Sequence, residues 1–172
     1  MCGLRRSEVL GLAWSAVDLD ARTVTITAGR VSVKGGTELG APKSWRSART
    51  LPISADLTDA LRAFRTAQAR ERLVIGAGWP DTGLVAVNAD GTPIRPETYS
   101  SMFRRLVADA GIPAIPLKGV RNTAATTLIG AGLSPVDAAA WLGHDPAMTL
   151  RVYAHAREEG PIAAADVLSR PS

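Results

Sequence analysis

The spacing of apolar residues changes at Ser54, and this change constrains the fold more than any other feature of the sequence. Before Ser54, β-branched and apolar residues alternate with polar ones, as in residues 23–27, which is typical of a strand with one buried face. After Ser54, apolar residues recur every three or four positions, as in Leu57, Leu61 and Phe64, which is typical of a helix. The chain therefore predicts an α+β domain that is mainly helical, with a small three-stranded antiparallel sheet near the N-terminus.

The part of the chain before Ser54 predicts a short helix followed by strands. An amphipathic helix is expected over residues 4–13, and Asp18-Leu19-Asp20 marks a turn. The expected strands, which are rich in β-branched residues, are residues 23–27, 31–33 and 49–53. A polar loop that contains Lys43 would connect the last two strands.

The part after Ser54 predicts a series of helices, marked by residues that commonly begin or end them. Ser54 is a candidate N-cap, and Ser134-Pro135 combines a capping residue with a first-turn proline. Gly132 follows another helix, since glycine readily adopts the positive φ found at helix ends. Residues 84–87 are expected to form a further short strand. The expected helices are residues 55–72, 97–110, 119–131, 135–142, 146–153 and 161–169.

The composition excludes several classes of protein. A chain of 172 residues suits a single domain with its own hydrophobic core. No apolar run approaches the roughly 18 residues that span a bilayer, and the first residues lack the apolar core of a signal peptide. The single cysteine, Cys2, excludes an internal disulfide and a cysteine-based zinc site. We therefore expect a soluble, cytoplasmic protein.

The positive charge lies in the first part of the chain. The net charge is +4, and residues 1–72 hold 12 Lys and Arg against 7 Asp and Glu. Residues 73–172 hold 8 Lys and Arg against 9 Asp and Glu. Much of the excess lies in one helix, where a solvated surface explains it, but Arg5, Lys43 and Arg49 flank turns and short apolar stretches. A nucleic-acid partner is permitted by this distribution but not required by it.

Short motifs carry the residues with the most specific chemistry. The first is Gly3-Leu4-Arg5-Arg6-Ser7-Glu8, and Lys43 follows in the polar loop. Lys118-Gly119-Val120-Arg121 comes at the start of a predicted helix. Leu142-Gly143-His144 ends another helix, and Tyr153 comes nine residues after His144. In this order and spacing, the motifs resemble the signatures of the tyrosine recombinases, the phage integrase family, over residues 3 to about 157.

The resemblance implies a DNA strand-cutting and rejoining enzyme with Tyr153 as its nucleophile. The tyrosine hydroxyl would attack a phosphodiester and form a 3′-phosphotyrosyl link, and covalent capture would divide one difficult step into two. Arg5 and Arg121 would bind the non-bridging oxygens, because guanidinium groups are planar and permanently charged. Lys43 would protonate the departing 5′ oxygen, and His144 would bond an oxygen or assist proton movement.

Lys118 departs from the family pattern, in which histidine is more common three residues before the second arginine. A lysine can still donate to a phosphate oxygen, but with a reference pKa of about 10.4 it is a poor general base at neutral pH. We count Lys118 as a sixth site residue. Asn122, where a second histidine is common, also departs from the pattern.

The resemblance also implies the partners and the domain organisation. The expected partner is double-stranded DNA at attachment sites, with four copies of the complete enzyme assembled around two duplexes and no membrane. Neither a metal nor a cofactor is expected, because cationic side chains can stabilise charge at phosphorus. Residues 1–172 would form a single catalytic domain that lacks the family's N-terminal DNA-binding domain and the first helix of its catalytic domain.

Each residue also has an ordinary structural interpretation. Arginines at helix starts are commonly solvated, His144 could cap a helix, and Tyr153 could pack in a core. Tyr99 is the other tyrosine, and it lies in the middle of a predicted helix. Glu8 either braces the arginines or is an exposed helix carboxylate. The alternative function is a non-catalytic DNA-binding remnant of an integrase, and a transcription regulator of unrelated fold would leave the ordered motifs unexplained.

Overall fold

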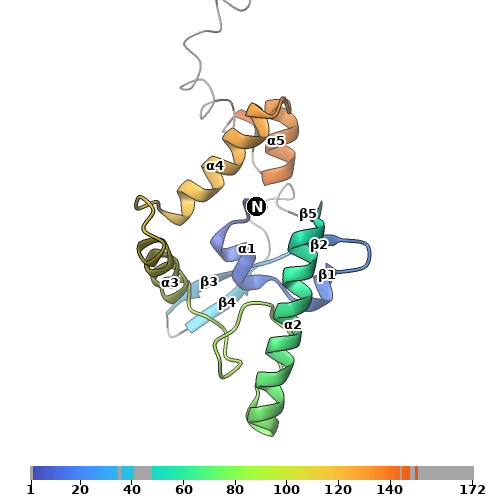
Figure 1. Cartoon of the computed structure of the whole chain (residues 1–172), viewed down its shortest axis with the longest axis vertical. Helices are drawn as coiled ribbons and strands as arrows, with labels where there is room; N and C mark the ends of the chain where they lie inside the picture. The colour runs from blue at the N-terminus through green and yellow to red at the C-terminus, as the bar shows by residue number, and fades with distance from the viewer. Residues whose placement is uncertain (1, 35, 41–47, 144, 148–149, 151–172) are drawn as a thin grey trace, which may run out of the picture.

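The structure is a computed structural model, and it describes residues 2–34, 36–40, 48–143, 145–147 and 150. The described chain forms two small antiparallel sheets with helices around them (Figure 1). The predicted helix at 161–169 lies outside these residues, and the one at 146–153 is described only at Pro146, Ala147 and Leu150, all of which are helical.

The elements follow the predicted order of a short helix, strands and then longer helices. The helices are α1 (Arg6–Gly11), α2 (Ala55–Ile75), α3 (Pro96–Asp109), α4 (Leu117–Gly130) and α5 (Pro135–Leu142). Single 3-10 turns lie at η1 (Trp14–Ala16) and η3 (Gly76–Gly78). The strands are β1 (Val17–Asp18), β2 (Thr23–Ile26), β3 (Gly29–Val33), β4 (Gly36–Gly40) and β5 (Arg49–Pro52). The predicted α+β class is confirmed.

The strands divide between two sheets, which differs in detail from the predicted arrangement. One sheet has the order β1-β2-β5, and its register pairs Val24 with Val17 on one side and Leu51 on the other. The predicted strand at 31–33 belongs instead to a hairpin, in which β3 pairs with β4. Strand β4 lies in a segment predicted as loop, because its sequence, GTELG, lacks the β-branched run that marks a strand. Its pairing with β3 supplies the order that its own sequence does not indicate.

Residues 84–87 do not form the predicted strand. Leu84 and Val87 each make one isolated bridge, to Ala13 and Pro93 respectively. The apolar run is explained by burial rather than by strand pairing, since Leu84 and Val85 are both buried. A run of four apolar residues is too short for its periodicity to distinguish these two causes.

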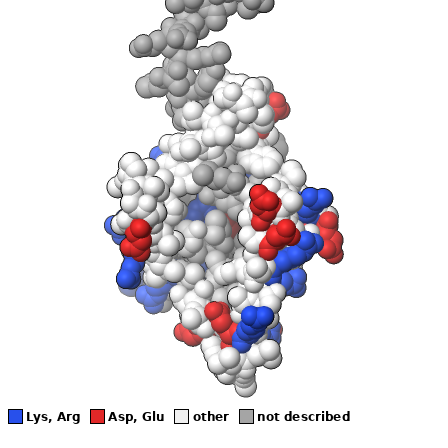
Figure 2. Space-filling model, in the orientation of Figure 1, with Lys and Arg blue, Asp and Glu red and all other residues white. Residues whose placement is uncertain are grey.

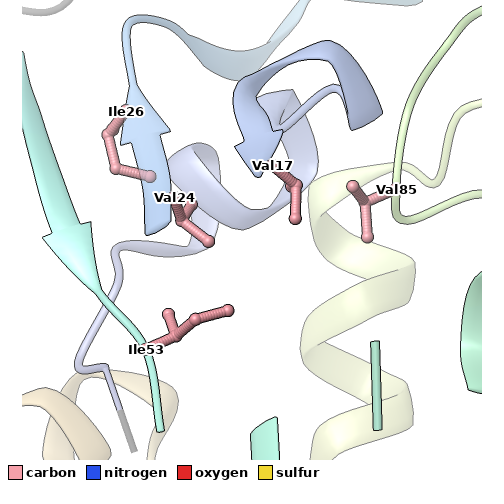
Figure 3. Packing of buried hydrophobic residues seen from close by; sticks show 5 residues of the cluster. All are labelled: Val17, Val24, Ile26, Ile53 and Val85. Carbon is pink, nitrogen blue, oxygen red and sulfur yellow. The ribbon is translucent and has the colours of Figure 1, made fainter. Parts of the chain in front are cut away.

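The main apolar core lies between the three-stranded sheet, α2 and the segments just before and after α1, from which Leu4 and Leu12 pack against it. Its buried members are Val17 of β1, Val24 and Ile26 of β2, Ile53 just after β5, and Val85 (Figure 3). Leu57 and Leu61 of α2 pack against this cluster from the helix side. Strand β2 alternates between buried and partly exposed residues, as its sequence predicts.

Helix α2 is the longest element and begins at the predicted cap. The Ser54 side chain accepts a hydrogen bond from the backbone N–H of Leu57. Near the middle of the helix, the Gln68 side chain accepts a hydrogen bond from Trp14 Nε1 at 2.6 Å and donates one to the Val85 carbonyl at 3.1 Å. These hydrogen bonds connect α2 to η1, through Trp14, and to the segment around Val85. Within the described residues, no helix is long and apolar enough to cross a membrane.

Helices α4 and α5 form a second unit, which lies beside the start of α1 (Figure 1). Ala124, Ala125 and Leu142 form a small buried cluster between them. Ser134 caps α5 through the backbone N–H of Asp137, and Pro135 occupies its first turn, as predicted. Helix α5 ends at Gly143, which adopts a left-handed conformation with φ 64°. Its carbonyl end therefore faces the N-terminal segment that leads into α1.

Candidate active site

The N-terminal segment passes tightly between α4 and α5 at Gly3. This residue has φ 64°, and a β-carbon there would lie 2.8 Å from Leu142 Cδ2 and 3.0 Å from Ala124 Cβ. Only glycine combines that backbone conformation with so close an approach. The Gly-Leu-Arg motif therefore has a local physical reason, because Gly3 lets the chain carry Arg5 to the end of α5.

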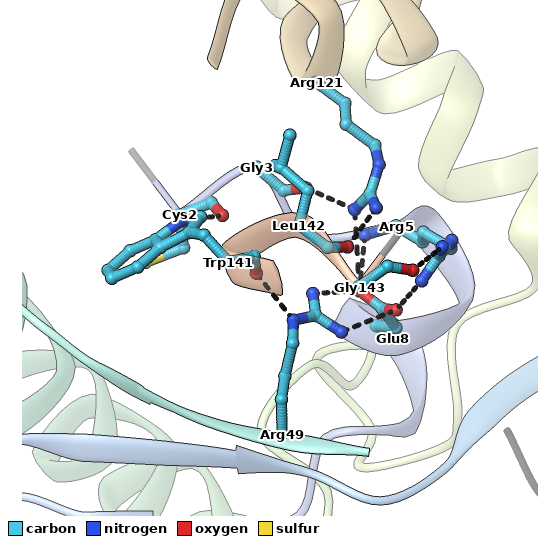
Figure 4. A network of polar contacts seen from close by, with 9 residues as sticks. All are labelled: Cys2, Gly3, Arg5, Glu8, Arg49, Arg121, Trp141, Leu142 and Gly143. Atoms are coloured by element: carbon cyan, nitrogen blue, oxygen red, sulfur yellow. Dashed lines mark hydrogen bonds and ion pairs between the residues drawn. The ribbon is translucent and has the colours of Figure 1, made fainter. Parts of the chain in front are cut away.

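Glu8 is the centre of a buried polar cluster at the start of α1 (Figure 4). Glu8 is only 4% exposed to solvent. Its carboxylate accepts hydrogen bonds from the backbone N–H of Arg5 at 2.9 Å and from Arg5 Nη1 at 2.5 Å. Arg49, the first residue of β5, donates to both carboxylate oxygens, at 3.2 Å and 3.1 Å. Of the two interpretations of Glu8, bracing of the arginines is therefore confirmed and the exposed carboxylate is wrong.

Arg121 reaches the same cluster from α4. It is 7% exposed, and its Nη1 lies 3.9 Å from the Glu8 carboxylate. The same guanidinium donates to the Gly3 carbonyl at 2.6 Å, across 118 positions of sequence. The fold thus brings together Arg5 and Arg121, the two arginines that the sequence singled out.

The carbonyl end of α5 is held by all three arginines. Arg49 Nε donates to the Trp141 carbonyl at 2.7 Å, Arg121 Nη2 donates to the Leu142 carbonyl, and Arg5 Nη2 donates to the Gly143 carbonyl at 2.5 Å (Figure 4). The last carbonyls of a helix have no partner within the helix and carry partial negative charge, so cationic donors suit them. Three consecutive carbonyls therefore accept hydrogen bonds from arginines in three separate parts of the chain.

The electrostatics of the cluster favour an anion. Burial raises the pKa of Glu8, but hydrogen bonds from Arg49 and Arg5 outweigh it and hold that pKa below its ordinary value, so the carboxylate is ionised at neutral pH. Burial, together with repulsion from Arg5, lowers the pKa of Arg121 to about 10, which still leaves it charged at neutral pH. Three guanidinium groups thus surround one carboxylate, and the cluster keeps a net positive charge.

A hollow of about 700 Å³ opens beside the cluster, between α1, α2, α3 and α4. Arg5, Arg121 and Lys118 line it on the basic side, and Leu57, Leu61 and Phe103 are among its apolar walls. Figure 2 shows the opening in the middle of the molecule, with basic atoms visible inside it. Lys118 is exposed and shares this hollow with the two arginines. Tyr99 also lines it, and burial raises the pKa of its hydroxyl.

Lys43, His144 and Tyr153, the other predicted site residues, lie outside the described residues. The described neighbours of His144 are Gly143, held by Arg5, and Asp145. Arg49 is not among the predicted site residues, although it flanks a turn and a short apolar stretch, where a solvated helix surface does not explain its charge. Among the described residues, no group of three or more His, Cys, Asp and Glu side chains could hold a metal ion.

Sequence comparison relates the chain to proteins of one family. The model of the phage integrase family matches residues 1–159. A XerC-like tyrosine recombinase of Caldanaerobacter subterraneus subsp. tengcongensis is 28% identical over 166 residues, which cover 89% of this chain and 42% of that protein. The tyrosine recombinase XerC of Mycobacterium sp. (strain KMS) is 30% identical over 154 residues, or 89% of this chain and 45% of that protein. The chain therefore spans less than half the length of these relatives.

Structural comparison finds the same fold in solved structures. The integrase of the Tn1549 transposon, in complex with transposon right end DNA, superposes with a TM-score of 0.81 and 24% identity over 98% of this chain and 56% of that one. The XerA recombinase superposes with a TM-score of 0.69 and 20% identity over 99% of this chain and 53% of that one. With the family model matching nearly the whole chain and the fold in agreement, this protein belongs to the phage integrase family.

Proposed function

We propose that this chain is the catalytic part of a site-specific recombinase, which cuts and rejoins DNA through a 3′-phosphotyrosyl intermediate on Tyr153. The observation that carries the proposal is the arginine cluster around Glu8. Arg5 and Arg121 come from distant parts of the sequence and meet beside one ionised carboxylate, with a net positive charge left over. A phosphodiester carries the single negative charge that such a cluster can bind, and more charge gathers on its oxygens during attack.

In the proposed reaction, the Tyr153 hydroxyl oxygen forms a bond to phosphorus as the bond from phosphorus to the 5′ oxygen breaks. The phenolic proton leaves to a base, and the 5′ oxygen gains a proton and departs as a hydroxyl group. Rejoining reverses these steps, because a 5′-hydroxyl attacks phosphorus and releases Tyr153. No bond energy is lost to water, since the phosphodiester is exchanged rather than hydrolysed.

The remaining site residues have proposed roles around the same phosphate. Arg5 and Arg121 bind the non-bridging oxygens in pairs, as their planar donors allow. Lys43 protonates the 5′ oxygen, and His144 bonds a non-bridging oxygen or assists proton movement. Lys118 donates to a phosphate oxygen in the position where the family more often has histidine, which is supported by its presence in the same hollow as the two arginines.

The proposed partner is double-stranded DNA that carries an attachment site on a phage or another mobile element. The structural comparison supports it, since the Tn1549 integrase was solved in complex with transposon right end DNA. A complete reaction joins two duplexes, so we propose a homotetramer for the full-length enzyme, acting in the cytoplasm. Binding through phosphates predicts affinity that falls as the salt concentration rises.

A covalent trap tests the proposal. The protein is mixed at low salt with nicked duplexes that are randomised around the nick and lose a short fragment once cleaved. We expect a protease-sensitive protein–DNA band on a denaturing gel, which Tyr153→Phe abolishes. Tyr99→Phe is the matched control, because Tyr99 is the other tyrosine of the chain and its loss should leave the band in place.

The other outcomes separate the alternatives. A folded protein that binds DNA but gives no band would contradict the recombinase function and favour the non-catalytic DNA-binding remnant. A band that persists in Tyr153→Phe and disappears in Tyr99→Phe would assign the nucleophile to Tyr99 instead.

A further inference from the structure

We infer that Arg49 is a positioning residue, which holds Glu8 and the end of α5 in the arrangement that presents Arg5 to the substrate. The inference rests on the proposed function for its catalytic consequence, but the positioning itself is a property of the folded protein. Arg49 is not among the predicted site residues, and its part in the site comes from its contacts.

Arg49 makes contacts in two directions from the first position of β5. Its Nε donates to the Trp141 carbonyl at 2.7 Å, while Nη1 and Nη2 donate to the two oxygens of Glu8 at 3.2 Å and 3.1 Å. Its side chain is only 8% exposed. The buried side chain of Arg49 thus makes directional hydrogen bonds to two other elements, α1 through Glu8 and α5 through Trp141, rather than a solvated ion pair.

These contacts connect Arg49 to Arg5 by two routes. Glu8 bonds both the backbone N–H and the guanidinium of Arg5, so any movement of Glu8 also moves Arg5. The Gly143 carbonyl, two residues after Trp141, accepts a bond from Arg5 Nη2. Arg49 therefore holds Glu8 directly, and it holds the end of α5 two residues before the Gly143 carbonyl that Arg5 bonds.

An arginine is required at this position because of geometry as well as charge. One guanidinium offers Nε on one side and two parallel donors at its end, which match a carbonyl and a carboxylate at the same time. A lysine would supply the charge at a single point and could not make all three of these bonds. The charged groups facing Glu8, among the described residues, are Arg5, Arg49 and Arg121. Without Arg49, Glu8 keeps Arg5 and the more distant Arg121.

Two measurements on the full chain test the inference. The first follows the side-chain carboxyl of Glu8 by ¹³C NMR as a function of pH, with the signal assigned from Glu8→Gln. In Arg49→Gln, we expect its titration midpoint to rise toward the ordinary glutamate value of about 4.3. The matched control is Arg62→Gln, which removes an arginine that is half exposed and bonded to surface carboxylates.

The second measurement separates binding from cleavage. In Arg49→Gln, we expect DNA affinity close to that of the parent protein and a rate of covalent complex formation lower by about 10- to 100-fold, as for a misplaced catalytic group. Arg49→Lys should not restore the rate, because the charge returns without the fork of donors. This variant also provides the test if Arg49→Gln does not fold.

The outcomes distinguish the inference from the proposed function. Parent-like cleavage by Arg49→Gln or by Arg49→Lys would overturn the positioning role while leaving the recombinase function intact. An unchanged Glu8 titration in Arg49→Gln would also overturn it. If no variant and no parent protein forms a covalent complex, but Arg49→Gln still raises the Glu8 midpoint, the proposed function is wrong and the positioning of Glu8 stands.

Discussion

The apolar core behind the three-stranded sheet and the polar cluster around Glu8 are both buried, but the cluster depends on contacts between more distant parts of the chain. Four of the five buried core residues lie within residues 17–53. The polar cluster joins residues as distant as Gly3 and Gly143. Apolar burial has no direction and scales with area, whereas each bond of the cluster depends on donor and acceptor geometry. We therefore expect the free energy of unfolding to fall gradually as volume is removed from the core, and to fall abruptly when a single group of the cluster is removed.

The largest effect should come from Glu8→Gln, which removes the carboxylate that three guanidinium groups share. Breaking a buried ionic group by removing one partner destabilises a protein by about 3–5 kcal/mol, because the remaining charges lose their compensation. Chemical denaturation would measure the free energy of unfolding, with Glu71→Gln on the exposed surface of α2 as the control. A loss under about 1 kcal/mol, similar to the control, would show that the cluster is no more sensitive than the surface.

The next effect concerns the apolar core at Ile26, which is 2% exposed. Ile26→Ala should destabilise the protein by about 2–5 kcal/mol, and Ile26→Val by about 0.5–1.5 kcal/mol, because the loss follows the volume removed. Denaturation of both variants tests the graded response. If Ile26→Val is as damaging as Ile26→Ala, the core behaves as the polar cluster does, and the contrast between the two regions fails.

A smaller effect is expected at Gly3, where the polar cluster depends on backbone geometry. Gly3→Ala places a β-carbon against Leu142 and Ala124 at a positive φ, so we expect a loss of about 1–3 kcal/mol in the free energy of unfolding. Gly36→Ala is the matched control, since nothing lies within 4 Å of a β-carbon there. Equal stability of these two variants would show that the passage between α4 and α5 can widen without penalty.

The smallest expected effect on stability comes from protonation of Glu8 at low pH. Its pKa in the folded protein is lowered, so its ionised form contributes stability that is fully present above the ordinary value and is lost as pH falls through the lowered pKa. Thermal unfolding should therefore change little from pH 7 to pH 5 through this group and more steeply below that range. The acid-dependent loss should be smaller in Glu8→Gln than in the parent protein. If the thermal stability of the parent protein and of Glu8→Gln fell in parallel with pH, the acid-dependent loss would not come from Glu8.

The local elements could be predicted where the sequence contains its own signals. The caps at Ser54 and Ser134 and the alternation along β2 were all confirmed, because each depends on neighbours a few positions away. Strand β4 and the bridges at residues 84–87 were not predicted, because they depend on partners elsewhere in the chain. The strand propensity of a segment does not predict its conformation where pairing with a distant segment determines it.

The sequence by itself determined the family and the order of elements, and it predicted Arg5 and Arg121 as site residues, since motifs keep their spacing whatever their surroundings. Only the tertiary structure decided that Glu8 is buried among arginines rather than exposed, and that Arg49 joins it from β5. The physical reason is that a charged side chain has the same helix or strand propensity whether it is solvated or buried. Its partners, brought from β5, α4 and α5, determine which of the two states it adopts.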